Sequence, residues 1–268
     1  MSGLFASVYC IDTGAGSGRF NMEFDMRLMQ SFSDGSFRRE FGSGSCLWRF
    51  YSWMPAAVSL GRNQDPADID ADRCRADGVD IVVRPTGGRA VYHADELTYS
   101  FFAETVESNE AVYRMVHEAI GRALEHAGVV PDFCRSQPDF RKRYATAEAV
   151  PCFTASAKYE LQVEGRKIVG SAQRRRGDVI LQHGSMPLSI RHRDIIRYIS
   201  AGDPGLIEAI VLDMERKTAS LDEFTRAGYD ELVQLIMQEA GGSDVTVTVL
   251  QPDDLSFLPA IREPIPNP

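Results

Sequence analysis

Several absences limit what this chain can be. No stretch of 18 consecutive apolar residues occurs, so the sequence predicts no membrane-spanning helix. The first residues contain no basic segment followed by an apolar run, so we expect no secretory signal peptide. The five cysteines are widely spaced and never arranged as C-x-x-C. This pattern argues against a disulfide framework or a zinc site and favours a reducing cytoplasm.

Basic residues are in the minority. Lys and Arg total 29 against 38 for Asp and Glu, so the formal net charge is −9. General electrostatic binding to nucleic acid or to an anionic membrane is therefore not expected. Hydrophobic residues make up 44% and charged residues 25%, which are ordinary proportions for a folded chain. The length suits one large domain or two small ones.

Apolar patterning predicts an α+β fold with a mixed or antiparallel sheet flanked by helices. Strand-like runs occupy 46–53, 56–60, 79–84, 89–92, 97–103 and 178–183, and a hairpin joins 158–163 to 166–173 through the turn Glu164-Gly165. The clearest helix runs from about Glu110 to Ala127, and another runs from a cap at Asn21 to about Phe32. The second helix places Met22, Met26 and Met29 on one face.

No shift in composition divides the chain strongly. We expect one catalytic domain over residues 1–250, with a core at roughly 40–230 and a small helical appendage near its C-terminal end. The proline-rich tail 251–268 is expected along the surface or partly disordered. Glycines between 14 and 18 resemble a dinucleotide-binding loop, but Arg19 stands where that motif needs glycine, which favours an ordinary loop.

The densest candidate segment is Arg84-Pro85-Thr86-Gly87-Gly88-Arg89-Ala90-Val91-Tyr92-His93. Adjacent glycines at 87 and 88 let the backbone approach a ligand and expose N–H groups. Arg84 and Arg89 could neutralise an anionic group nearby. The residues alone leave open a simple turn between strands, and His93 alone could be a hydrogen-bonded structural histidine.

Two further segments contain candidate residues. Lys167 lies in an alternating strand and could point along a pocket or face solvent. Gly170, Ser171 and Ala172 follow it, and three small residues in a row suit close contact with a ligand carbonyl. His183 and Gly184 end an apolar strand and, taken alone, are an ordinary strand end.

Together these segments resemble the lipoate–protein ligase and octanoyltransferase branch of the biotin/lipoate ligase superfamily. The similarity runs from Asn21-Met22, through Arg49–Trp53, to about His183-Gly184-Ser185. It implies an α+β catalytic domain whose mixed sheet carries a pocket for a medium acyl chain or a lipoyl group. It also assigns substrate-binding roles to the three segments, at Arg84, Gly87, Gly88, Arg89, Ala90, His93, Gly170, Ser171, Ala172, His183 and Gly184.

Two chemistries compete within this branch. Ligases adenylate a free carboxylate with ATP, whereas octanoyltransferases start from an activated thioester, whose attack suits a cysteine nucleophile. Cys152 lies in a proline-containing loop just before the strand pair that carries Lys167. The sequence resembles ligase-like octanoyltransferases, in which such a cysteine takes the acyl group and the lysine lowers its thiol pKa. Tyr159-Glu160 stands where ligases commonly carry Asn-Asp, and a third glycine after Gly88 is missing; both departures favour the transferase.

The resemblance therefore predicts a protein N-octanoyltransferase with Cys152 and Lys167 as catalytic residues and no metal or cofactor. Its expected partners are an octanoyl-acyl carrier protein as donor and a lipoyl domain or glycine cleavage H protein as acceptor, with no nucleic acid and no membrane. The alternatives are an ATP-dependent lipoate–protein ligase, an octanoyl amidotransferase and a non-enzymatic scaffold. Basic clusters at 141–143, 174–176 and 191–193 could dock an acidic carrier or be solvated turns.

Overall fold

The structure is a computed structural model, and it describes residues 4–133, 159–200, 204–242 and 245–258. No helix within these ranges is long and apolar enough to cross a membrane. The principal strands are β1 (Ser7–Gly16), β2 (Ser45–Trp53), β3 (Ala57–Leu60), β4 (Asp80–Val83), β5 (Val91–His93), β6 (Glu96–Glu104), β7 (Asp132–Phe133), β8 (Leu161–Val163), β9 (Arg166–Lys167), β10 (Gly170–Arg176), β11 (Val179–Pro187) and β12 (Val247–Val249). The α-helices are α1 (Gly18–Ser33), α2 (Ser36–Phe41), α3 (Ala71–Ala76), α4 (Asn109–His126), α6 (Pro204–Lys217) and α7 (Tyr229–Ala240).

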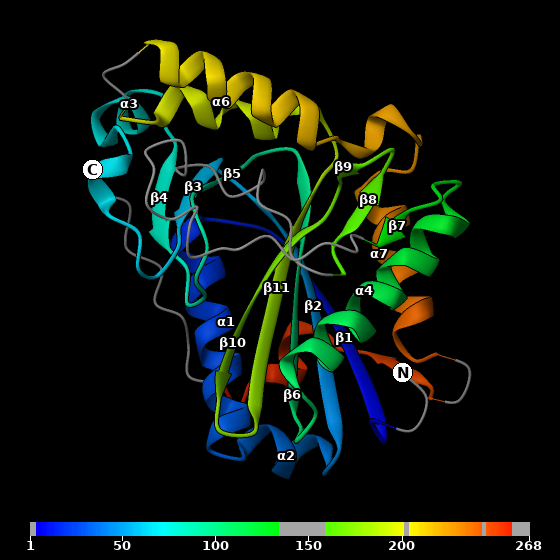
Figure 1. The fold of residues 1–268 in the computed structure, drawn as a ribbon. Coiled ribbons are helices and arrows are strands. Elements are labelled where there is room, and N and C mark those ends of the chain that lie inside the picture. The colour runs from blue at the N-terminus through cyan, green and yellow to red at the C-terminus, as the bar shows by residue number, and fades with distance from the viewer. Residues whose placement is uncertain (1–3, 134–158, 201–203, 243–244, 259–268) are drawn as a thin grey trace.

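A six-stranded mixed sheet forms the centre, in the order β10-β11-β6-β2-β1-β12 (Figure 1). The pairs β10–β11, β11–β6 and β6–β2 are antiparallel, whereas β1 runs parallel to both β2 and β12. Two three-stranded sheets flank it, in the orders β4-β3-β5 and β7-β8-β9. This architecture confirms the α+β class predicted from the sequence.

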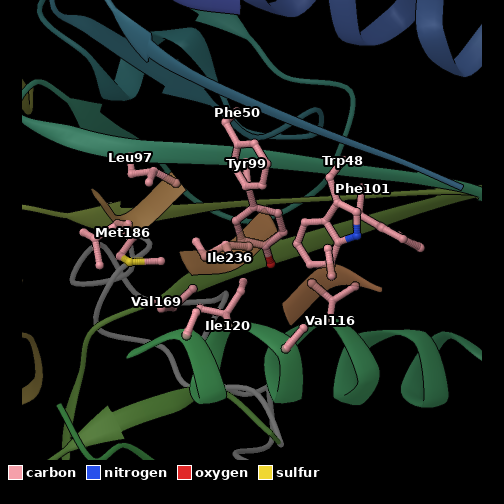
Figure 2. Packing of buried hydrophobic residues seen from close by; sticks show 14 of the residues in the cluster. Trp48, Phe50, Leu97, Tyr99, Phe101, Val116, Ile120, Val169, Met186 and Ile236 are labelled. Atoms are coloured by element: carbon pink, nitrogen blue, oxygen red, sulfur yellow. The ribbon is translucent and has the colours of Figure 1, made fainter. Parts of the chain in front are cut away.

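Helices cover both faces of the central sheet, with α1 and α2 on one side and α4 and α7 on the other (Figure 1). Both faces are covered, because β2, β6 and β11 are buried along nearly their whole length. Figure 2 shows the α4 side, where Trp48, Tyr99 and Phe101 of the sheet pack toward Val116 and Ile120 of α4. The second side packs Leu28 and Phe32 of α1 against the opposite face.

The observed elements correct several sequence predictions. Ser17, not Asn21, caps helix α1, and the glycines expected to form a loop belong to β1 and to the start of that helix. Met22 and Met29 are buried on α1, but Met26 is exposed. The core extends beyond 40–230, because β1, α1 and α7 all contribute buried residues. The tail also contributes, since Leu255 is buried in the short helix Pro252–Leu255.

A fully buried ion pair joins α1 to the sheet. The Arg49 guanidinium of β2 lies 2.7 Å from an Asp25 carboxylate oxygen of α1, and both side chains are 0% exposed. Arg49 also donates to the backbone and side-chain oxygens of Asn21 and to Thr13, and it stacks over the Tyr51 ring at 3.9 Å. Buried charges are tolerated only when hydrogen bonds replace the lost water, and these contacts provide them.

Asp25 is equally well bonded. It accepts hydrogen bonds from Tyr51 Oη at 3.2 Å and from Ser100 Oγ at 2.7 Å. Burial alone would raise the pKa of Asp25, but Arg49, together with hydrogen bonds from His183 and Ser100, holds it below its usual value. The pair therefore remains charged inside the core.

Replacing Asp25 with Ala should destabilise the fold by about 3–5 kcal/mol, because Arg49 would be left buried without a counter-charge. Urea unfolding followed by circular dichroism measures this loss. The matched control is Asp72→Ala, which removes an ion pair with Arg75 whose side chains are 90% and 75% exposed. That variant should unfold near the wild-type midpoint. Equal midpoints for the two variants would contradict the structural importance of the buried pair.

Candidate functional site

A pocket opens beside the central sheet, with an empty volume of about 480 Å³ that includes open solvent. It is lined by α1, β2, β3, β5, β6, β9, β10 and β11. The predicted residues on its wall are Arg84, His93, Lys167, Gly170, Ser171, Ala172, His183 and Gly184. Gly87, Gly88, Arg89 and Ala90 are not part of this lining, although they belong to the same loop as Arg84.

Lys167 is almost completely buried and ion-paired. Its ammonium lies 2.7 Å from Glu160 Oε1, and both side chains are 3% exposed. The hairpin that carries it turns at Glu164 and Gly165, which both adopt the left-handed conformation, as the predicted turn requires. Of the two interpretations of Lys167, the pocket orientation is therefore confirmed and the solvated one is wrong.

Arg84 holds the glycine loop together. Its guanidinium donates to the carbonyl oxygens of Ser59, Gly87 and Arg89, at 2.9, 3.0 and 2.6 Å. The loop also packs tightly on β3's end, because a Cβ on Gly61 would clash with the Gly88 carbonyl. The contacts of Arg84 with these carbonyls show that it shapes one wall of the pocket.

His93 belongs to a second polar group at the pocket. Its ring stacks on Trp53 with a centroid distance of 4.1 Å, and its Nδ1 lies 2.7 Å from Glu96 Oε1. Glu96 also accepts hydrogen bonds from Thr98 and Ser185. Burial would raise the pKa of Glu96, but the neighbouring His93 and these hydrogen bonds lower it overall. His93 is thus held in a fixed orientation by a carboxylate.

His183 connects the pocket to the buried ion pair. Its Nε2 lies 2.6 Å from Thr86 Oγ1, and its Nδ1 faces Asp25 at 3.6 Å. Burial lowers the pKa of His183, although Asp25 acts in the opposite direction. The first and third sequence motifs therefore meet through the contact between Thr86 and His183.

Gly184 leaves room for its neighbours across the strands. It is paired with Ser171 in the β10–β11 ladder. A Cβ at this position would overlap Ser171 Oγ and would lie 2.6 Å from a Tyr99 ring carbon. Glycine at 184 is therefore required for Ser171 and Tyr99 to meet at hydrogen-bond distance.

Comparison with known proteins identifies the family of the chain. The model of the family described as the lipoyl protein ligase A/B catalytic domain matches residues 17–240. The chain belongs to this family. The resemblance inferred from the three motifs is thereby confirmed at the level of the family.

Two curated relatives show the similarity in more detail. The chain is 37% identical over 216 residues to the octanoyltransferase LipM of Exiguobacterium sp., covering 76% of each protein. It is 38% identical over 197 residues to octanoyltransferase LipM of Lysinibacillus sphaericus, covering 70% of this chain and 68% of the relative.

Solved structures confirm the fold. A bipartite lipoate protein ligase of Thermoplasma acidophilum superposes with a TM-score of 0.70 at 18% identity, covering 95% of this chain and 91% of that one. A lipoate-protein ligase A with bound ATP gives a TM-score of 0.66 at 19% identity, with 95% and 92% coverage. At these identities the comparison supports a shared fold only.

Several residues of this family member's site were not found from the sequence. Asp25 falls between Met22 and Met29 on the buried face of α1, and His117 lies on the apolar face of α4. A polar residue on an apolar helical face is the signal that could have revealed both. Glu160 was noticed only as a departure from the ligase pattern, and its pairing with Lys167 required the three-dimensional structure.

The cysteines divide into two groups. Cys10, Cys46 and Cys74 are buried, and burial raises the pKa of each thiol, to about 11 for Cys74. Such thiols are poor nucleophiles near neutral pH. Cys134 and Cys152 lie outside the described residues. None of the described cysteines lines the pocket.

The basic clusters have different environments. Arg175 donates to Asn109 Oδ1 and to the carbonyls of Thr105 and Glu107, so it secures the start of α4. Arg174 reaches the Pro85 carbonyl at 3.3 Å, and Arg193 bonds the Thr218 carbonyl at 2.9 Å. The cluster at 141–143 lies outside the described residues. Arg175 and Arg193 therefore already make hydrogen bonds within the fold, and docking of a carrier would have to use the same guanidinium groups.

Replacing Gly184 with Ala should destabilise the protein by about 1–3 kcal/mol, because the added methyl group would overlap Ser171 Oγ and the Tyr99 ring. Thermal unfolding measures the effect. Gly121→Ala in helix α4 is the control: a Cβ there meets its nearest atom, Leu161 Cδ2, at 3.6 Å. It should be neutral or stabilising by up to roughly 1 kcal/mol. A Gly184→Ala protein as stable as the control would show that the space is more adaptable than the structure indicates.

Proposed function

We propose that this protein transfers an octanoyl group from the thioester of an acyl carrier protein to a lysine of a lipoyl domain or glycine cleavage H protein. The main support is a buried, ion-paired lysine on the wall of a pocket in a family member whose curated relatives are named octanoyltransferases. The bipartite ligase of Thermoplasma acidophilum belongs to a lipoylation system together with its E2 lipoyl domain, which agrees with an acceptor of that kind.

Cys152 is the proposed nucleophile. Its thiolate attacks the carbonyl carbon of the octanoyl thioester, and the carrier's thiolate leaves and takes up a proton, so a second thioester forms at little energetic cost. Cys152 stands seven positions before Tyr159, whose carbonyl is bonded to His117. Seven extended residues span at most roughly 25 Å, which allows the thiol to reach Lys167. The three buried described thiols are unsuited to this step.

Lys167 is the proposed electrostatic partner. Its ammonium would stabilise the thiolate form of Cys152, and Glu160 holds that ammonium in place. The oxyanion of the tetrahedral intermediate requires hydrogen-bond donors. The candidate donors are the backbone N–H groups of Gly87-Gly88 and those of Gly170-Ser171-Ala172. Only the second group lines the pocket, so we assign stabilisation of the oxyanion to backbone N–H groups of β10. Gly87 and Gly88 serve instead to shape the loop that Arg84 closes.

The second half-reaction regenerates the enzyme. The neutral amine of the acceptor lysine attacks the carbonyl of octanoyl-Cys152, loses a proton and forms an amide, while the Cys152 thiolate departs. Conversion of a thioester to an amide is downhill, so no nucleotide is required. This separates the proposed transferase from a ligase, which must first activate a free carboxylate.

The first test is direct detection of the acyl-enzyme. Incubation with octanoyl-acyl carrier protein should add one octanoyl mass to the wild-type chain, measured by intact mass spectrometry, and hydroxylamine should remove it. Cys152→Ala should show no adduct, whereas Cys134→Ala should be labelled like the wild type. Equal labelling of Cys152→Ala would overturn the assignment. Product formation from free octanoate only when ATP is present would support the ligase instead.

The second test addresses Lys167. Lys167→Met alone would leave Glu160 buried without its counter-charge, so it is combined with Glu160→Gln, and the wild type is the reference. The double variant should alkylate Cys152 with iodoacetamide about tenfold more slowly at pH 7, as expected if the thiol pKa rises by one unit. Peptide mass spectrometry separates Cys152 from the other thiols. An unchanged rate would mean that Lys167 does not stabilise the thiolate.

A further inference from the structure

His117 is a fully buried side chain that the proposed chemistry leaves without a role. It lies on the apolar face of α4 and contacts the Tyr113 ring at a centroid distance of 4.4 Å. Its Nδ1 is 2.8 Å from the Tyr159 carbonyl oxygen, and its Nε2 is 2.8 Å from Ser171 Oγ. Both neighbours lie near the pocket. Ser171 lines it, and Tyr159 immediately precedes Glu160, which is ion-paired with the pocket residue Lys167.

The Tyr159 carbonyl determines the tautomer of His117. A carbonyl oxygen can only accept, so Nδ1 must carry the proton. Burial lowers the pKa of His117 to about 3, with Lys167 acting in the same direction, so the ring is neutral near pH 7. The neutral ring has one proton, and Nε2 is therefore an acceptor. It follows that Ser171 donates its only hydroxyl proton to His117.

A second chain of hydrogen bonds reaches Ser171 from the opposite side. Gln173 Nε2 donates to the Asn109 carbonyl, at 2.9 Å, and the same nitrogen donates to Gln182 Oε1, at 2.8 Å. The Gln182 amide nitrogen then donates to Tyr99 Oη at 3.0 Å. Tyr99 Oη lies 2.7 Å from Ser171 Oγ.

The direction of this chain is determined at both ends by backbone carbonyls. Because the Ser171 hydroxyl donates its proton in a hydrogen bond to His117, Tyr99 must be the donor in its contact with Ser171. In Figure 2 the Tyr99 hydroxyl points from the sheet toward α4, the helix that carries His117. Ser171 Oγ therefore accepts from Tyr99, donates to His117 and has no proton left for a ligand.

We propose that His117 is a positioning residue that accepts the hydrogen bond of the Ser171 hydroxyl, so that Ser171 meets the substrate only as a hydrogen-bond acceptor and favours a ligand N–H group over a carboxylate. A carboxylate has no proton to give near neutral pH, whereas an amine or amide N–H can donate to Ser171. The attacking amine of the acceptor lysine carries such a proton. The proposal rests on the proposed function in one respect: the ligand's head group lies at the Lys167 and Ser171 end of the pocket.

The same contacts argue against Ser171 as a second nucleophile. A serine is activated by a neighbouring base whose pKa lies near the working pH. The His117 ring is a weak base by this criterion. Its contribution is therefore to fix the direction of the hydroxyl and not to remove its proton.

The experiment compares two probes of the same chain length, octanamide and octanoate, by isothermal titration calorimetry on the full chain. In His117→Phe the Ser171 hydroxyl no longer donates a hydrogen bond to the imidazole and can donate one to a carboxylate. The ratio of octanoate to octanamide affinity should then rise about threefold to tenfold over the wild-type ratio, the range for one net hydrogen bond. In the control, Tyr99→Phe, the Ser171 hydroxyl still donates its hydrogen bond to His117. The ratio of octanoate to octanamide affinity should therefore stay within about twofold of wild type.

Thermal unfolding establishes that each variant is folded. An unchanged ratio in folded His117→Phe, or an equal shift in Tyr99→Phe, would overturn the proposal. Ser171→Ala keeps the test decisive if His117→Phe does not fold. It should weaken octanamide about threefold to tenfold while octanoate binding is unchanged or improved, and equal weakening of both probes would overturn the proposal.

A spectroscopic measurement tests the tautomer without any ligand. Nitrogen-15 NMR of histidine-labelled protein should show a resonance pair for His117 with Nδ1 protonated and Nε2 unprotonated between pH 5 and 8. The pair is assigned by its loss in His117→Phe. An Nε2-protonated or cationic ring would overturn the proposal. Neither measurement requires Cys152 to be acylated, so a failed acyl-enzyme experiment and a failed Ser171 experiment are distinguishable.

Discussion

The buried contact between Arg49 and Asp25 is the constraint on which the site depends. Removing two charges from water costs several kcal/mol per ion unless geometry and hydrogen bonds compensate. Here each nitrogen of the Arg49 side chain has a partner either on β1 or on α1. The first helix, the central sheet and the pocket wall are therefore held in one arrangement, because a small displacement would leave a charge without its partner.

The pocket inherits its shape from this arrangement. Asp25 faces His183, and His183 contacts Thr86 in the glycine loop, so the loop's position is linked to the ion pair through a single imidazole. Arg84 then closes the loop on its own carbonyls. The glycines contribute by what they lack: Gly61 and Gly184 let backbone and side-chain atoms approach where a methyl group would collide. Glycine at 61 and at 184 is thus explained in this chain by packing.

The two polar systems of the pocket have different electrostatic characters. The pair formed by Lys167 and Glu160 brings full charges to one end, where an ionised nucleophile would be stabilised. The chain from Gln173 to Tyr159 carries no full charge, and the backbone carbonyls of Asn109 and Tyr159 at its two ends give its hydrogen bonds a direction. A transferase needs both properties at one site. In the proposed reaction, charge would favour the Cys152 thiolate, and a fixed acceptor would select the amine that follows.

Much of the fold could be predicted from the sequence, because the signals are local. The apolar periodicity of 110–127, the turn Glu164-Gly165 and the apolar strand runs depend on neighbours a few residues apart, and the structure confirms them. The three motifs also sufficed to indicate the family. Helix α6 and the parallel pairing of β12 with β1 were missed, because they depend on contacts with distant segments.

By itself the sequence determined most of the elements, the family and the small residues that line the pocket, since these follow from side-chain size and spacing along the chain. Only the tertiary structure decided which polar groups meet. Asp25 with Arg49, Glu160 with Lys167 and His117 with Ser171 join residues from different elements. Hydrogen bonds and ion pairs act over about 3 Å in space, and sequence spacing does not encode which distant segments come that close.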